Sequence, residues 1–90
     1  DVEGEADRRE EFLSRVASRA AKRASDSGRS VALEPMNGRD RRMIHMAVRD
    51  LDAVATLSIG EGRYRQVVIV PKGAPDYEEA KKSSEATPES

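Results

Sequence analysis

Two short apolar runs that follow one another late in the sequence limit the folds open to this chain. Residues 53–59 alternate apolar and polar side chains, and residues 64–70 form a stronger apolar run that ends at Pro71. Residues 60–62 read Gly-Glu-Gly and supply the glycines that a tight hairpin turn needs. Because strands joined by a tight turn are antiparallel, the pattern predicts a β-hairpin and excludes a sheet built only from parallel crossovers.

An amphipathic helix is expected near the start of the chain. Residues 8–27 repeat apolar side chains at three- and four-residue spacing, which predicts a helix with one buried side. Asp7 is the expected N-cap, with Glu10 three residues later as in a capping box, and Gly28 is the expected stop. The side expected to face the core comprises Phe12, Leu13, Val16, Ala17, Ala20, Ala21 and Ala24.

A short strand and a second helix are expected between the first helix and the hairpin. Residues 30–34 are partly β-branched and end before a proline, which favours a short strand. Asn37 is the expected N-cap of a helix that runs to about Arg49 or Leu51. Asp40 in its first turn suits the positive end of the helix dipole.

This order of elements predicts an α+β domain. It consists of a small three-stranded sheet with two helices packed on one face, in the order α-β-α-β-β. Residues 8–73 are expected to form the domain and residues 1–7 a linker. Residues 74–90 are rich in Ala, Pro, Ser, Glu and Lys, and a disordered acidic tail is expected there.

Charge is distributed unevenly along the chain, although the net charge is only −1. Residues 8–73 hold 14 Lys and Arg against eight Asp and Glu, whereas both ends are acidic, and a basic centre favours an anionic partner. The absence of Cys excludes a disulfide framework and a thiolate metal site. No apolar stretch approaches the ~18 residues of a membrane span, so no membrane association is expected.

The second helix carries the one histidine of the chain, His45, four residues after Arg41. Residues four apart lie about one turn apart on one side of a helix, so the two side chains are expected to project together. Arg42 and Arg49 flank them within roughly 100° around the axis, with the apolar side roughly opposite. That apolar side comprises Ile44, Ala47, Val48 and Leu51. We therefore expect a cationic side turned to solvent, for which backbone phosphates are the commonest partner.

The residues around this pair resemble a known domain. Arg41 and His45 are preceded by Leu-Glu-Pro-Met-Asn at residues 33–37 and followed by Gly-Glu-Gly-Arg-Tyr-Arg-Gln-Val-Val-Ile-Val-Pro at residues 60–71. This pattern closely resembles the R-3-H domain, named for an arginine and a histidine separated by three residues. More narrowly, it is similar to the version at the C-terminus of the bacterial Jag proteins, also called SpoIIIJ-associated or KhpB proteins. The likeness spans roughly residues 1–72.

The resemblance implies a small α/β domain that binds single-stranded nucleic acid, in these bacterial proteins chiefly RNA. Family members carry a KH domain just before this one, and residues 1–4 resemble the exit of its last strand, but the sequence has no GXXG loop of the KH type. We therefore expect a monomeric, cytoplasmic fragment of a longer protein. Its expected partners are single-stranded RNA or DNA and, through the full-length protein, another KH-domain protein.

The candidate nucleic-acid contacts are Arg41, His45, Arg42, Arg49 and Arg65. A guanidinium forks onto a phosphate or stacks on a base, and an imidazole donates a hydrogen bond or stacks. The simpler interpretation is an exposed pair that keeps the surface soluble, with Arg42 and Arg49 paired to Asp50 or Asp52. Because an unperturbed imidazole titrates near ~6.5, binding is expected to strengthen between about pH 8 and pH 6.

The sequence gives less support to other classes of function. The main alternative is a protein-interaction domain that uses the same cationic side to dock on an acidic partner or on its own KH domain. Enzyme activity is not expected, because the single His has no Cys partner and the Gly-Glu-Gly turn precedes a strand rather than opening a helix. No catalytic residue, cofactor or metal site is expected.

Overall fold

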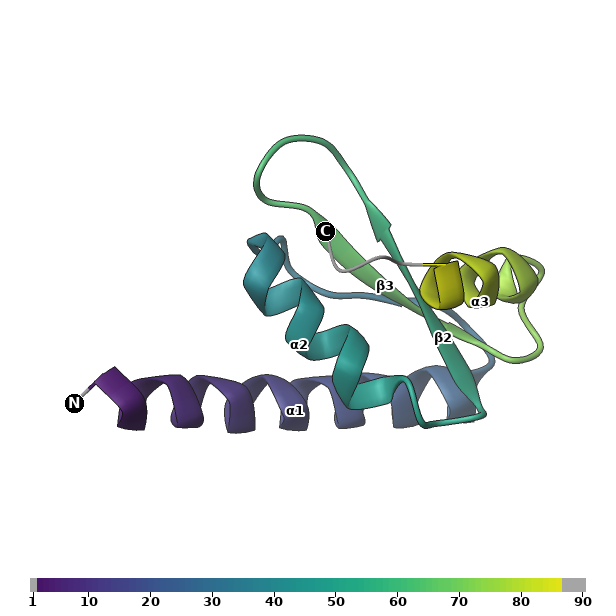
Figure 1. Ribbon diagram of the computed structural model, residues 1–90. Helices are drawn as coiled ribbons and strands as arrows, with labels where there is room; N and C mark the ends of the chain where they lie inside the picture. The colour runs from purple at the N-terminus through teal and green to yellow at the C-terminus, as the bar shows by residue number, and fades with distance from the viewer. Residues whose placement is uncertain (1, 87–90) are drawn as a thin grey trace.

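A computed structural model of the chain describes residues 2–86, and the side chains of residues 8–82. Within these residues it contains three helices and a three-stranded sheet (Figure 1). The elements in chain order are α1 (Val2–Ser27), β1 (Val31–Ala32), α2 (Gly38–Val48), β2 (Val54–Ile59), β3 (Gln66–Pro71) and α3 (Tyr77–Ala86). The predicted α+β class and the order of the first five elements are confirmed.

α1 is longer than expected. The helix begins at Val2 rather than after Asp7, so the expected linker is helical over residues 2–7. Acidic residues at the start of a helix suit its positive dipole end, and no proline interrupts this stretch. The predicted end is confirmed, because Gly28 has a φ of 73° and its N–H donates to the carbonyl of Ala24 at 2.8 Å.

The three strands form one antiparallel sheet in the order β1-β3-β2. β2 and β3 pair along their whole length, which confirms the predicted hairpin. Gly60 and Gly62 at its tip have φ values of 102° and 83°, which side chains other than glycine rarely adopt. β1 is shorter than the expected 30–34 and pairs with β3 over two residues, and a further isolated bridge joins Met36 to Arg65.

α2 begins as the sequence predicts. Asn37 is its N-cap, and the side-chain Oδ1 accepts the N–H of Asp40 at 2.8 Å. Asp40 is only 7% exposed, and its Oδ2 lies 2.6 Å from Nη2 of Arg9. This ion pair, which no sequence pattern indicated, ties the first turn of α2 to α1.

α1 and α2 pack on the same face of the sheet, as predicted (Figure 1). Buried residues in this layer are Leu13, Ala17, Ala20, Ala21, Ala24, Ile44, Val48, Val54, Val67 and Ile69. Small alanine side chains allow α1 to lie close to the sheet and α2. The buried arc of α1 is narrower than expected, since Phe12 is 49% exposed. Leu51, expected on the apolar side of α2, follows the end of that helix and is 43% exposed.

α3 contacts the other face of the sheet and corrects the expectation of a disordered tail. Residues 74–90 have the composition of a disordered segment, yet Tyr77 and Ala80 are buried against Ala55 and Val70. These two side chains lie three residues apart, so one turn of helix places both on the sheet. The periodic signal is too short to stand out in the sequence.

A polar contact also holds α3 in place. The hydroxyl of Tyr77 donates to the carbonyl of Asp52 at 3.2 Å, at the connection between α2 and β2. The part of the expected tail at residues 87–90 lies outside the described residues.

Candidate nucleic-acid interface

Arg41 points from the first turns of α2 toward the hairpin. Its Nη1 donates to the carbonyl of Met36 at 2.8 Å and to that of Arg63 at 3.3 Å, and the side chain is half-buried. The Met36 carbonyl also accepts the backbone N–H of Arg65 at 3.0 Å. One nitrogen of Arg41 thus joins the segment before α2 to the hairpin. Its Nε and Nη2 have no acceptor among the described residues.

His45 lies one turn further along α2, over β2. Its Nδ1 is 2.5 Å from the hydroxyl oxygen of Thr56, and its Nε2 is 3.3 Å from that of Ser58. Thr56 and Ser58 are two residues apart on β2, so both face the helices. Both ring nitrogens are therefore hydrogen-bonded within the protein, which leaves the ring face and carbon edge for any further contact.

This geometry corrects the expectation of a cationic pair turned to solvent. Arg41 and His45 are both half-buried. Arg41 is hydrogen-bonded to Met36 and to the hairpin, and His45 is hydrogen-bonded to the hairpin. The physical reason is the helix period, because Val48, seven residues after Arg41, lies only about 20° away from it around the axis. Val48 is in the core, so Arg41 flanks the buried side of α2 and not the side opposite to it.

Arg65 joins the same cluster from the hairpin. Its Nη2 donates to the carbonyl of Ser58 at 3.1 Å, and the hydroxyl of Ser58 contacts His45. The Nε of Arg65 is buried and has no hydrogen-bond partner within the described part of the chain. We refer to the residues that meet here as the α2–hairpin junction: Arg41, His45, Thr56, Ser58 and Arg65.

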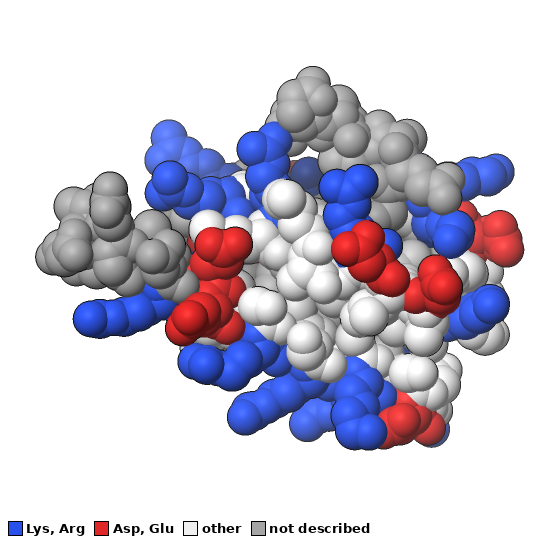
Figure 2. Space-filling view, turned by 60° about the horizontal axis from the view of Figure 1, so that its bottom comes forward, with Lys and Arg blue, Asp and Glu red and all other residues white. Residues whose placement is uncertain are grey.

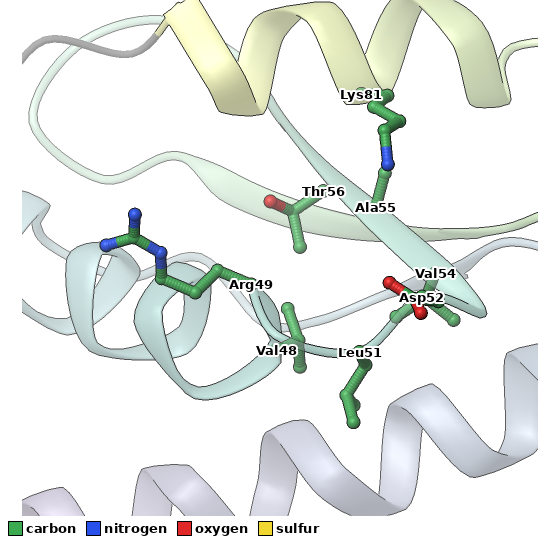
Figure 3. A pocket seen from close by; sticks show the side chains of 8 residues that line it. All are labelled: Val48, Arg49, Leu51, Asp52, Val54, Ala55, Thr56 and Lys81. Atoms are coloured by element: carbon green, nitrogen blue, oxygen red, sulfur yellow. The ribbon is translucent and has the colours of Figure 1, made fainter.

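The other two candidates lie beside the junction on the outer side of α2. Arg42 and Arg49 are both exposed. Figure 3 shows Arg49 extending away from Asp52. Over the described residues Arg49 forms no ion pair, so neither Asp50 nor Asp52 neutralises it, in contrast to the simpler interpretation. The structure therefore groups three candidates at the junction and two exposed arginines next to it.

Burial changes the expected acid–base behaviour of His45. Loss of hydration, together with the positive charge of Arg41, lowers the pKa of His45 below its ordinary value of 6.5. The imidazole therefore gains its proton at a lower pH than a free histidine does. The sequence-based expectation that His45 strengthens binding between about pH 8 and pH 6 does not follow from this environment.

Thr56 and Ser58 are the site residues that the sequence interpretation missed. Both lie on the core-facing side of a strand, where a polar side chain needs a hydrogen-bond partner. The alternation of Val54, Thr56 and Ser58 along one strand face was the available signal. It places the two hydroxyls on the same strand face as Val54, but it does not show which helix residue they contact.

The described residues include a small pocket but no cluster of metal-binding side chains. One pocket of about 80 Å³ lies between the end of α2, the start of β2 and α3, with Val48, Thr56 and Lys81 among its walls (Figure 3). No group of three or more His, Asp or Glu side chains within the described residues is arranged to hold a metal ion. None of the described helices is both long and apolar enough to cross a membrane.

Comparison of the sequence with known proteins identifies the class of domain that has this fold and this junction. The sequence matches the R-3-H domain family over residues 11–71, and the chain belongs to that family. It is similar to the RNA-binding protein KhpB of Clostridium symbiosum, with 42% identity over 69 residues, or 77% of this chain. The aligned part is 31% of the length of that relative. The resemblance seen in the sequence is thereby confirmed.

Proposed function

We propose that this chain is a nucleic-acid-binding module that holds single-stranded RNA at the α2–hairpin junction and at the exposed arginines beside it. The observation that carries the proposal is uncompensated positive charge. In the described part of the chain, Arg41, Arg49 and Arg65 have no carboxylate partner. A similar protein is named as RNA-binding, which supports the same ligand class here.

The residues of this surface have different roles in the proposal. Arg42 and Arg49 are exposed and bind backbone phosphates. Arg41 uses Nη1 within the protein and offers Nε and Nη2 to a phosphate, so it acts from a fixed position. His45 offers its ring face to a base, because both of its nitrogens are already engaged. Arg65 supports Ser58 and lines the junction.

A binding module of this kind needs no catalytic group, and we propose no enzymatic activity. We also propose that the chain acts as a monomer in the cytoplasm, where its RNA ligand is found. In the longer protein, an upstream KH domain would supply further RNA contacts, and another KH-domain protein is the proposed protein partner.

A titration of fluorescent single-stranded RNA at several salt concentrations tests the proposal. With ~3–5 phosphate contacts, the logarithm of the affinity falls with the logarithm of the salt concentration by roughly 0.7 per contact. Arg49→Glu is expected to weaken binding and to flatten this dependence. Lys72→Glu is the matched control, because Lys72 is an exposed cation at the opposite end of β3 from the hairpin tip. Equal behaviour of the two variants contradicts the proposal.

A second experiment separates RNA from an acidic protein as the partner. The chain is used to capture ligands from a bacterial lysate with and without nuclease treatment. RNA capture that Arg49→Glu abolishes supports the proposal. A protein partner that remains after nuclease treatment, with no RNA recovered without it, contradicts the proposal and favours a docking domain.

A further inference from the structure

A second basic surface lies on α1, on the side that faces away from the sheet. Arg8, Arg15, Arg19, Lys22 and Arg23 are all exposed, and we call them the α1 basic face. On a helix of 3.6 residues per turn, the first four lie within about 60° of one another, opposite the buried Leu13, Ala17 and Ala24. Figure 2, which brings the bottom of Figure 1 forward, shows Lys and Arg side chains along the lower edge of the molecule.

The spacing of these cations is unfavourable for the helix alone. Arg15, Arg19 and Arg23 follow one another at four-residue intervals, and like charges at that interval repel. Among the described residues only Lys22 of this face has a carboxylate partner, Asp26 at 3.4 Å. The last turn of α1 contains no basic residue, so these side chains do not serve the negative end of the helix dipole.

An exposed aromatic residue borders the α1 basic face. Phe12 precedes Arg15 by three residues and Arg19 by seven, so it lies on the same side of the helix, and it is 49% exposed. The guanidinium of Arg9 lies 5.7 Å from the centre of its ring. A row of cations next to an exposed ring is the combination that binds single-stranded nucleic acid, with phosphates on the cations and a base on the ring.

We propose that the α1 basic face is a second contact surface for single-stranded RNA, separate from the α2–hairpin junction. The arginines bind successive phosphates along about 22 Å of helix, from Arg8 to Arg23, and Phe12 stacks with an unpaired base. A lipid surface fits poorly, since the apolar side of α1 is buried in the protein. The ligand class rests on the proposed function, but the surface and its residues do not.

The two surfaces face different directions. α1 packs with its buried side toward α2 and the sheet, and the junction lies between α2 and the hairpin. A short oligonucleotide therefore binds one surface at a time, whereas a longer strand passes over α2 and reaches both. With both surfaces, the small domain contacts a longer stretch of RNA than it does with the Arg41 and His45 region alone.

The test is an NMR titration of the 90-residue chain with a single-stranded oligouridylate of about four nucleotides and one of about sixteen. Amide signals from α1 residues 15–23 are expected to shift, as a set distinct from those of α2 and the hairpin. Arg19→Glu removes the α1 set and leaves the other set in place, and Arg49→Glu has the converse effect. Lys82→Glu, an exposed charge change on α3, alters neither set.

Each failure has its own signature. If only the α2 and hairpin signals shift, the second surface is wrong and the proposed function stands. If only the α1 signals shift, the α1 surface stands and the junction proposal is wrong. Equal shifts with an oligoglutamate, or with duplex RNA of the same length, overturn the assignment to single-stranded RNA.

A stability measurement distinguishes a ligand contact of Arg19 from a structural role of this residue. Arg19→Glu turns two repulsive pairs into attractive ones, so its thermal midpoint is expected to rise while affinity for the longer RNA falls several-fold. Phe12→Ala is expected to weaken binding of the longer RNA, and Phe12→Tyr to retain it. A fall in both the midpoint and the affinity of Arg19→Glu would overturn the proposal.

Discussion

Arg41 combines a structural contact with a candidate ligand contact. Its Nη1 holds two carbonyls, those of Met36 and Arg63, while its other nitrogens have no acceptor among the described residues. The loss of RNA binding in an Arg41 variant would therefore not by itself identify a phosphate contact. Stability and binding have to be measured together for this residue.

Replacing Arg41 with Ala is expected to lower the free energy of unfolding by about 1–2 kcal/mol, because two hydrogen bonds to backbone carbonyls are lost. Urea unfolding followed by circular dichroism measures this change. Arg49→Ala is the control, since an exposed side chain of this kind typically changes stability by less than about 0.5 kcal/mol. Equal stability of the two variants would show that the Arg41 contacts contribute nothing in solution.

The environment of His45 makes stability depend on pH. Because its pKa is lowered in the folded protein, the unfolded chain binds the proton first as the pH falls below about 6.5. The contribution of His45 to folding is therefore complete above that pH and is lost as the pH decreases toward the folded-state pKa. Urea unfolding across this range is expected to show the loss, and His45→Gln is expected to remove it.

At the residue scale, the orientation of the candidate side chains could not be predicted from the sequence. The sequence predicted Arg41, His45 and Arg65 as candidate contacts, and the structure brings these three residues together at the α2–hairpin junction. Their partial burial depends on the position of the hairpin relative to α2. A projection of α2 alone gives no information about that position. The proximity of Val48 to Arg41 around the helix axis was a local clue to it.

Elements with a clear period or turn chemistry were predictable. The hairpin followed from its glycines, and α2 from its asparagine cap. α3 was not predictable because only Tyr77 and Ala80 anchor it within its described side chains, amid charged and small residues. The ion pair between Arg9 and Asp40 joins residues 31 positions apart, a distance over which the pattern of either helix carries no information.

Tyr77 provides a direct test of α3. Tyr77→Ala is expected to lower the free energy of unfolding by about 3 kcal/mol, because a buried aromatic ring is removed from the contact with Ala55 and Val70. Tyr77→Phe loses only the hydrogen bond to Asp52 and is expected to cost about 1 kcal/mol. If both variants unfold as the unchanged protein does, α3 is not docked on the sheet in solution.

The molecule as a whole is nearly neutral, yet its described basic side chains concentrate on α1, on α2 and near the hairpin. The net charge of −1 therefore gives no indication of the fields at these surfaces. Acidic residues gather instead near the two ends of the sequence. A sliding count of charge could reveal this separation, but only the fold shows that the basic residues form two surfaces.

These two surfaces predict additive effects on RNA binding. Arg19 lies on α1 and Arg49 at the end of α2, and they share no ion-pair partner within the described residues. The free-energy changes of Arg19→Glu and Arg49→Glu are therefore expected to add within about 0.5 kcal/mol. Fluorescence titration of the longer RNA with both single variants and the double variant measures this. A larger coupling would mean that the two side chains contact one shared portion of the ligand.

The Met36 carbonyl accepts hydrogen bonds from both Arg65 and Arg41, and so joins the segment before α2 to the hairpin near its tip. A ligand at this place meets a receptor that is already assembled, and little conformational entropy remains to be lost on association. We therefore expect a flexible RNA strand to bind there to a preorganised, rigid site. The backbone amide of Arg65 should exchange its hydrogen as slowly before RNA is added as afterwards.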